Sequence, residues 1–233
     1  MKRFIAFSAV LVLLAFCLGT SGSAEEPDTE DEKAEVYRSK ENDEMKIALT
    51  FDDGPHPYYT AEILDILEKY GVKATFFFVG QNIEYYPDVA DKVYLAGHEI
   101  GNHTYTHHRV RALDHAELLR EMNKCDDAIY EIHEYRPKLF RPPEGAFDDD
   151  ARRTAKYMDY SVILWAVDTR DWEHPSPDMI LRNVMTNVKS GDIILMHDYI
   201  GHDSPTPRAL GMVIPALLEK GYKFVTVSEL IGK

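Results

Sequence analysis

Short apolar runs alternate with longer amphipathic stretches from residue 45 to the end of the chain. Seven runs predict β-strands, at 46–51, 74–79, 98–102, 138–141, 160–167, 192–197 and 223–227. The stretches between them predict helices, at 58–70, 87–96, 112–132, 148–158, 177–188 and 205–220. Strands separated by helices pair in parallel, so the pattern predicts an α/β fold. A closed or nearly closed barrel is expected at this length, with an open doubly wound sheet as the alternative.

The first 24 residues follow a different pattern. Lys2 and Arg3 precede an apolar run, Phe4–Leu18, that is short for a membrane span, and small residues follow at 22–24. This order predicts a secretory signal peptide at 1–24, cleaved after Ala24, with an uncleaved anchor as the alternative. We therefore expect a secreted or cell-envelope protein without a membrane span after cleavage.

Residues 25–44 are rich in Glu and Asp and contain almost no large apolar side chains. This composition predicts a solvated acidic linker, which leaves 45–233 as the folded domain. After cleavage Cys125 would be the only cysteine, so no disulfide is expected within the mature chain. Its place in a predicted helix favours burial.

Acidic residues outnumber basic ones along the whole chain. The formal net charge is −14, from 26 Lys and Arg against 40 Asp and Glu. Removal of Lys2 and Arg3 with the leader would change it to −16, which is −14 minus 2. Because no stretch is rich in Lys or Arg, nucleic acid and anionic lipid are not expected partners.

Five polar strings follow the predicted strands. They are TFDDGP at 50–55, HTYTH at 103–107, RPPEG at 141–145, DTRDW at 168–172 and LMHD at 195–198. In a β/α barrel the C-terminal ends of the strands form one face, so we expect the strings to converge there. Together they supply carboxylates, histidines and an arginine, a set suited to metal-assisted hydrolysis.

The acidic pair and the histidine pair are the candidates for metal and proton chemistry. Adjacent carboxylates at a strand end, Asp52 and Asp53, point in different directions, so one can bind a metal while the other takes a proton. A simple turn is the alternative. His103 and His107 are four residues apart, and on one helical turn their rings would face the same side. With one carboxylate they would form a two-His, one-Asp site, and surface histidines are the alternative.

Three further residues have side chains suited to supporting roles. Arg141 can neutralise and orient a carboxylate, or form a surface ion pair. Trp172 can form an apolar wall for a small acyl group or a sugar face, or pack in the core. His197 ends an apolar strand and is the candidate general acid.

In this order the five strings resemble those of the polysaccharide deacetylases with a NodB homology domain, carbohydrate esterase family 4. The resemblance runs from about Lys46 to about Leu230 and implies a distorted (β/α) barrel of about seven units. It implies one divalent metal, with zinc expected and cobalt, nickel or manganese as alternatives. The ligands that it implies are Asp53, His103 and His107.

The same resemblance implies roles for the other candidates. Asp52 would be the general base held by Arg141, and His197 the general acid tuned by Asp171. Trp172 and Leu195 would line an acetyl pocket, and a backbone N–H after Pro143 would stabilise the oxyanion. Many relatives have an aromatic residue where this chain has Glu144, so the wall of the substrate site differs here.

The implied reaction removes N-acetyl groups from peptidoglycan or chitin-like polysaccharide and releases acetate. An acetylated polysaccharide is then the expected partner, and the protein is expected to be a monomer. An acetylxylan esterase on the same scaffold is the close alternative. A non-catalytic carbohydrate-binding relative is a further alternative, but it would require the loss of a ligand or of the base, and all are present.

Overall fold

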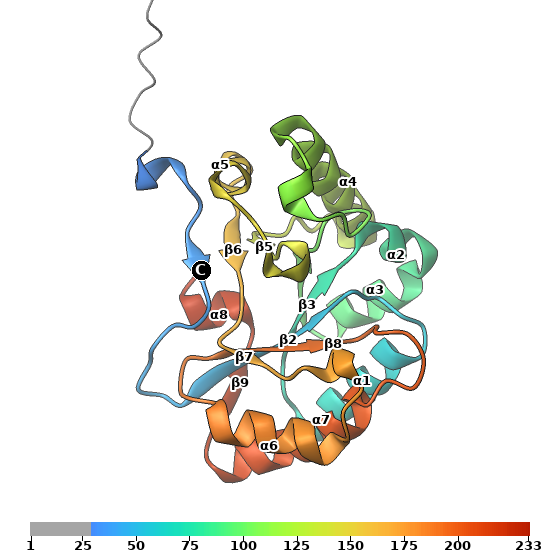
Figure 1. The fold of residues 1–233 in the computed structure, drawn as a ribbon. Helices are drawn as coiled ribbons and strands as arrows, with labels where there is room; N and C mark the ends of the chain where they lie inside the picture. The colour runs from blue at the N-terminus through green and yellow to red at the C-terminus, as the bar shows by residue number, and fades with distance from the viewer. Residues whose placement is uncertain (1–28) are drawn as a thin grey trace, which may run out of the picture.

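A computed structural model describes residues 29–233, which fold around one parallel sheet (Figure 1). The predicted signal peptide, 1–24, lies outside the described residues. The strands are β1 Val36–Tyr37, β2 Lys46–Asp52, β3 Thr75–Phe78, β4 Glu99–Asn102, β5 Leu139–Phe140, β6 Ser161–Ile163, β7 Val167–Asp168, β8 Ile193–His197 and β9 Lys223–Val225. The helices are α1 Tyr59–Tyr70, α2 Gly80–Tyr85, α3 Pro87–Leu95, α4 His115–His133, α5 Asp149–Tyr157, α6 Pro177–Asn187, α7 Thr206–Glu219 and α8 Val227–Ile231.

The strand order is β1-β6-β5-β4-β3-β2-β8-β7, with β9 paired to β2, and every one of these pairs is parallel. The sheet is curled into a half-barrel with helices around it, which confirms the expected α/β barrel-like fold. The predicted strand at 160–167 is in fact two strands, β6 and β7, separated by residues 164–166. Because β6 pairs with β5 and β7 pairs with β8, this one stretch of chain contributes to both ends of the curled sheet.

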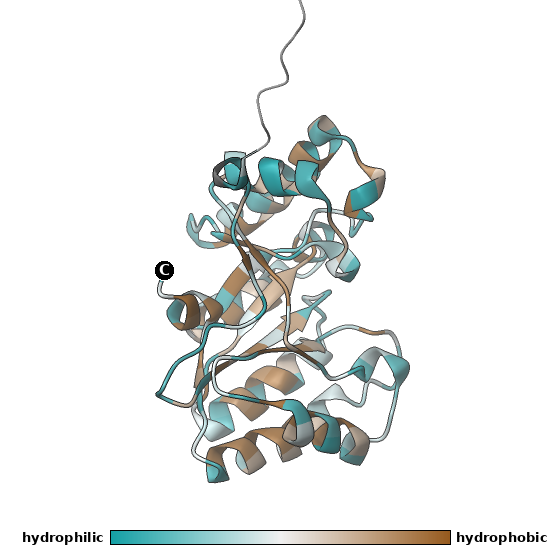
Figure 2. Ribbon diagram, turned by 60° about the vertical axis from the view of Figure 1, so that its left-hand side comes forward, coloured by the Kyte–Doolittle hydropathy of each residue, from teal (hydrophilic) through white to brown (hydrophobic). Residues whose placement is uncertain are grey.

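The alternation of side chains along β2 separates the core from the site. Ile47, Leu49 and Phe51 belong to the main hydrophobic cluster, together with side chains of α1 and α7. The intervening residues Thr50 and Asp52 therefore lie on the opposite face of the strand, inside the curl. Figure 2 shows hydrophobic residues on the strands and a mixture of hydrophobic and hydrophilic residues along the helices. A buried strand thus carries two polar side chains into the interior of the half-barrel.

Local sequence signals explain where several helices begin and end. Asp114 and Glu117 form a capping box, so α4 begins at His115 rather than at the predicted residue 112. Gly71, in the left-handed conformation, ends α1. Ser176 accepts the Met179 N–H and caps α6. Sequence reasoning missed α2 and α8, which are only six and five residues long.

The expectation of an acidic linker at 25–44 is wrong for its described part, residues 29–44. Strand β1 pairs with β6, and Ala34 is buried in a hydrophobic cluster beneath α5. Lys33 is also buried, and its Nζ lies 2.9 Å from a carboxylate oxygen of Asp149. A few small or aromatic side chains therefore attach an acidic segment to the domain, because they fit at an edge strand and do not need a long apolar run.

Two further sequence expectations concern membranes and the cysteine. Within residues 29–233, no helix has both the length and the apolar character needed to cross a membrane. Cys125 is fully buried in α4, as predicted, and burial raises the pKa of its thiol.

Candidate active site

The C-terminal ends of the strands bring most of the predicted residues to the wall of one cavity, while Arg141, Pro143 and Asp171 are buried and do not line it. Strand β2 ends at Asp52, β4 is followed by His103, and β8 ends at His197. The cavity has a volume of about 470 Å³ and is lined by Asp52, Asp53, His103, His107, Arg109, Glu144, Trp165, Asp168, Trp172, Leu195 and His197. The convergence expected from the strand ends is thus present in the structure.

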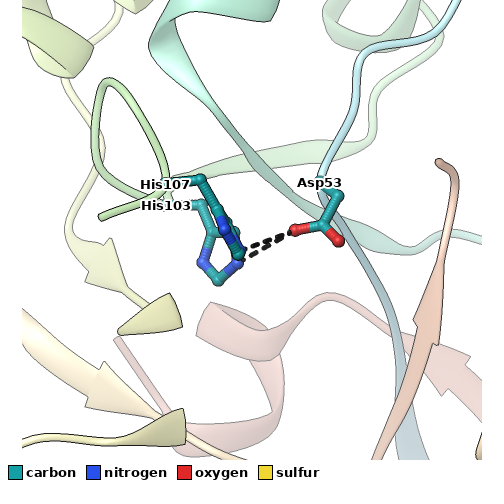
Figure 3. Close-up of side chains that lie close together, drawn as sticks. All are labelled: Asp53, His103 and His107. Atoms are coloured by element: carbon teal, nitrogen blue, oxygen red, sulfur yellow. Dashed lines mark ion pairs between the residues drawn. The ribbon is translucent and has the colours of Figure 1, made fainter. Parts of the chain in front are cut away.

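Asp53, His103 and His107 form a compact trio at the edge of this cavity (Figure 3). The Oδ1 atom of Asp53 lies 3.1 Å from Nε2 of His107 and 3.4 Å from Nε2 of His103. One ligand atom from each residue lies within 4.8 Å of the other two. Asp53 Oδ1 is buried and accepts no hydrogen bond from the described residues. It faces the two imidazoles, and its lone pairs are available to a metal ion. This set fits a divalent metal such as zinc.

The two histidines do not share a helical turn, contrary to the expectation from their spacing. They lie in a loop in which Thr104 and His107 both have positive φ, at 63° and 58°. Asn102 Oδ1 accepts the N–H of Thr104 at 2.8 Å. Glu121 of α4 accepts the N–H groups of residues 105 and 106 at 3.1 and 2.8 Å. Side chains from β4 and α4 thus hold a loop conformation that its own sequence disfavours.

The tautomer of His103 follows from its second contact. Its Nδ1 lies 2.7 Å from the carbonyl oxygen of Arg141, and because a carbonyl only accepts, Nδ1 carries the proton. Nε2 is then left with its lone pair on the side of Asp53. This is the arrangement in which a neutral histidine binds a metal.

The guanidinium of Arg141 holds Asp52 inside the curl of the sheet. Its Nη1 donates to Asp52 Oδ1 at 2.7 Å and to the Thr50 hydroxyl at 2.8 Å. Its remaining donors reach the carbonyl oxygens of Ile163 and Leu164, at 3.2 and 3.1 Å. Arg141 is fully buried, and burial lowers its pKa while the charge of Asp52 opposes that effect. Asp52 is therefore a fixed carboxylate whose second oxygen lies 3.9 Å from His103 Nε2.

His197 is paired with a buried carboxylate. Its Nδ1 lies 2.7 Å from Oδ1 of Asp171, whose Oδ2 accepts the backbone N–H of His197 and the hydroxyl of Thr206. Burial alone would lower the pKa of His197, but the hydrogen bond and charge of Asp171 raise it to about 9. Since Nδ1 is engaged, Nε2 is the nitrogen available to the cavity that His197 lines. The pair can therefore keep a proton at neutral pH and deliver it to a leaving group.

The candidates for substrate contact are divided between the cavity wall and its support. Trp172, Leu195 and Glu144 line the cavity, whereas Pro143 is buried and does not line it. Glu144 has a φ of 59° and its Oε1 accepts from Nε of Arg109 at 2.9 Å. Sequence reasoning missed Arg109 and Trp165 as lining residues. Trp165 was hidden inside a predicted strand, because the break between β6 and β7 has no Gly or Pro to mark it.

The sequence of this chain is similar to those of known proteins. The model of the family named polysaccharide deacetylase matches residues 39–163. A peptidoglycan-N-acetylglucosamine deacetylase of Bacillus cereus is 42% identical over 193 residues, which cover 82% of this chain and 90% of that protein.

Solved structures match the same region. A peptidoglycan N-acetylglucosamine deacetylase in complex with 4-naphthalen-1-yl-N-oxidanyl-benzamide superposes with a TM-score of 0.82 at 35% identity, over 86% of this chain and 94% of that one. A Bacillus anthracis protein described as a pseudoenzyme of carbohydrate esterase family 4 has a TM-score of 0.79 at 33% identity, over 84% of this chain and 68% of that one. The fold thus occurs both in a named deacetylase and in a pseudoenzyme.

Proposed function

Because the chain belongs to the polysaccharide deacetylase family, a family of hydrolases, we propose that it removes N-acetyl groups from peptidoglycan or a chitin-like glycan outside the cytoplasm. The single observation that carries the proposal is that the Asp53–His103–His107 trio, Asp52 and His197 line one cavity, with Arg141 and Asp171 paired to the last two from the protein interior. The trio would hold one divalent cation, which we take to be zinc. When bound, that cation supplies Lewis acidity at the acetyl carbonyl and at the attacking water.

The remaining steps follow from the side chains of this protein. Asp52 accepts a proton from the attacking water while the water oxygen forms a bond to the acetyl carbon. Arg141 holds Asp52 in the orientation for that transfer, through the 2.7 Å contact described above. The C–N bond then breaks, and His197 gives its proton to the departing sugar nitrogen. The direct products are acetic acid and an amino sugar, with Asp52 protonated and His197 neutral. Asp52 then releases its proton to solvent, His197 takes one up, and acetic acid ionises to acetate, so atoms and charges balance over the cycle.

The raised pKa of His197 favours an amide over an ester as the substrate. An amine leaves poorly unless it is protonated, whereas an alkoxide leaving group depends less on a strong acid. A histidine whose pKa is about 9 remains protonated at neutral pH, as amide cleavage requires. Trp172 and Leu195 supply the apolar surface that an acetyl methyl group would contact.

Acetate release from defined substrates tests this function. Metal-loaded protein would be incubated with N-acetylglucosamine oligomers, with peptidoglycan and with acetylated xylan, and acetate would be measured over time. We expect release from the first two substrates and at most slow release from xylan. Chelation should abolish activity, and added zinc should restore it.

The matched control for this assay is Asp52→Asn, which keeps the shape of the side chain and removes the base. Acetate release that was equally fast in Asp52→Asn, or that survived complete metal removal, would contradict the mechanism. Fast release from xylan alone would replace the proposed amide substrate with an ester. No release from any acetylated glycan would place the protein with its non-catalytic relative.

A further inference from the structure

A cluster of aromatic rings lies on the two chain segments that leave the cavity. His56 stacks on Tyr199, with centroids 4.7 Å apart and planes 8° apart, and on Tyr59, at 4.9 Å and 25°. Tyr58 and Tyr86 contact the same histidine at 5.8 and 6.3 Å. We call these five residues the ring cluster; Tyr85 adjoins it through Tyr86, at 6.4 Å. None of these residues lines the cavity, so the proposed reaction leaves them without a role.

Most of these rings are open to solvent. The exposed fractions are 74% for Tyr58, 64% for Tyr85, 42% for Tyr199 and 37% for Tyr86. These four make up nearly half of the nine exposed large hydrophobic side chains among residues 29–233. Exposed hydrophobic side chains that occur singly need no explanation, but a contiguous group of this kind marks a binding surface.

The ring cluster is continuous with the proposed catalytic residues along the chain. His56 is three residues after Asp53, and Tyr199 is two residues after His197. An extended chain advances at most about 3.6 Å per residue. The Cα atom of His56 therefore lies within roughly 11 Å of that of Asp53, and the Cα atom of Tyr199 within roughly 7 Å of that of His197. A polymer with one unit in the cavity would have its neighbouring units at such distances.

Hydrogen bonds fix the position of His56, the central ring of the cluster. The His56 N–H donates to the Thr60 hydroxyl at 2.8 Å, and that hydroxyl donates to buried Asp198 at 2.5 Å. His56 Nδ1 accepts from the N–H groups of Tyr58 and Tyr59, both at 3.3 Å. Burial, and secondarily the charge of His202, lowers the pKa of His56, so the ring is neutral at neutral pH. The ring cluster therefore presents fixed, uncharged faces, which cost little entropy to use in binding.

Two kinds of ligand stack on exposed aromatic faces: nucleobases and sugars. Nucleic acid also needs cationic groups for its phosphates. The ring cluster contains no Lys or Arg, and the chain has a net charge of −14. Pyranose rings instead have apolar C–H faces and a rim of hydroxyls, which match the faces and hydroxyls of tyrosines.

We propose that the ring cluster binds neutral pyranose units of the same glycan strand, next to the sugar whose acetyl group enters the cavity. This inference rests on the proposed function, because it takes the glycan as the substrate. It adds a second contact region that would make the protein prefer longer oligomers to short ones. The exposed Tyr58 and Tyr199 are the rings that contribute most to it.

Binding of a neutral chitin pentamer to metal-loaded Asp52→Asn protein tests the inference without turnover. Titration calorimetry would compare this protein with a version that also carries Tyr58→Ala and Tyr199→Ala. The matched control carries Tyr157→Ala, a tyrosine that is also strongly exposed but lies on α5. We expect affinity for the pentamer to fall about tenfold in the first variant, a loss of about 1.4 kcal/mol, and to stay within about twofold in the control.

A turnover assay with Asp52 intact supplies the second readout. The double tyrosine variant should lose more kcat/KM on the pentamer than on the dimer. Unchanged affinity, no binding of the pentamer to either protein, or an equal loss on both oligomer lengths would overturn the inference. If the pentamer binds through the ring cluster but no acetylated glycan is hydrolysed, the proposed function fails while the binding site stands.

Discussion

The backbone carbonyl oxygen of Arg141 accepts the Nδ1 proton of His103, at 2.7 Å. The same residue holds Asp52 with its side chain, also at 2.7 Å. One residue therefore orients a candidate metal ligand through its backbone and the candidate base through its guanidinium. The distance between the ligand and the base is set by this shared partner, and a change confined to the side chain should affect the base while leaving the backbone contact to the metal ligand in place.

Arg141→Lys tests that separation. Lysine keeps the charge but cannot reproduce the planar set of four contacts, so Asp52 should lose its fixed orientation. We expect kcat to fall about 10- to 100-fold, as for loss of a supporting contact, while zinc affinity stays within a few-fold. Kinetics and chelator competition on the same preparation measure both quantities. Parallel losses of metal and rate would show that the guanidinium also supports the metal ligands.

Asp52→Asn separates the base from the metal in the other direction. Loss of a positioned base costs about 100- to 10,000-fold in rate, whereas the trio that would hold the cation remains complete. The variant also leaves Arg141 without its partner charge, so the melting temperature should fall, because an unpaired buried charge is unfavourable. Metal analysis should give the same metal content as the original protein. A steep loss of metal would assign Asp52 as a ligand.

The dependence of rate on pH should report the Asp171–His197 pair. Asp171 raises the pKa of His197 to about 9, and the protonated form is the one that serves as acid. Activity should therefore decline as the pH rises through that pKa. Asp171→Asn removes the charge that raises the pKa, so the alkaline decline should move to lower pH. An identical alkaline limb in both proteins would assign it to another group.

The same pair links stability to pH. The folded-state pKa of His197 exceeds its ordinary value of about 6.5, so folding favours the protonated form. This contribution is fully present below about pH 6.5 and is lost as the pH rises to about 9. Thermal unfolding between these limits should show a smaller decrease in stability for Asp171→Asn than for the original protein.

The loop of the metal trio should depend on Glu121, which accepts the backbone N–H groups of residues 105 and 106. Glu121→Ala should weaken zinc binding about 10- to 100-fold, the effect of losing an outer support of a metal site. Glu121→Gln keeps an acceptor oxygen and should recover part of the affinity. The matched control is Glu131→Ala, an exposed residue of the same helix. Equal affinities in all three variants would show that the loop does not need this support.

Truncation tests the corrected view of the N-terminal segment. A protein that begins at residue 41 lacks β1, the buried Ala34 and the Lys33–Asp149 pair. We expect it to lose about 2 kcal/mol of unfolding free energy, or roughly 4–8 °C in melting temperature. A protein that begins at residue 29 keeps these contacts and is the control. Equal melting temperatures would restore the interpretation of 29–40 as a linker.

The candidate site could be predicted from the sequence to the extent that it depends on strand ends. Asp52, His103 and His197 follow or end apolar runs, and the topology of parallel strands then brings them together. The details that the sequence did not indicate depend on long-range contacts. A spacing of four between His103 and His107 is compatible with a helix. The loop that forms instead is held by the side chains of Asn102 and Glu121, and by two N–H groups of α2 that donate to the carbonyl oxygens of residues 104 and 105.

Edge contacts were equally hidden from sequence reasoning. Strand β1 is two residues long, too short for any periodicity to appear, and it forms because β6 offers it a free edge. The Arg109–Glu144 pair joins two loops 35 residues apart, and local patterns carry no information about such a contact. The family resemblance implied that the cavity wall of this chain lacks the aromatic ring that many relatives have at this position. It did not indicate that Glu144 would form an ion pair with Arg109.

Because the strand is interrupted between β6 and β7, Arg141 also has a structural role. Where the strand is interrupted, the guanidinium donates to the buried carbonyl oxygens of Ile163 and Leu164, so a side chain takes the place of backbone pairing between the two ends of the half-barrel. His107, in contrast, is partly exposed, and among residues 29–233 its side chain has no hydrogen bond or ion pair outside the trio. A library of variants that is selected for folding, and not for acetate release, should therefore retain arginine at position 141 and accept many residues at position 107. Such a selection would divide the polar residues in and around the cavity into two groups: those required for folding and those required only for catalysis.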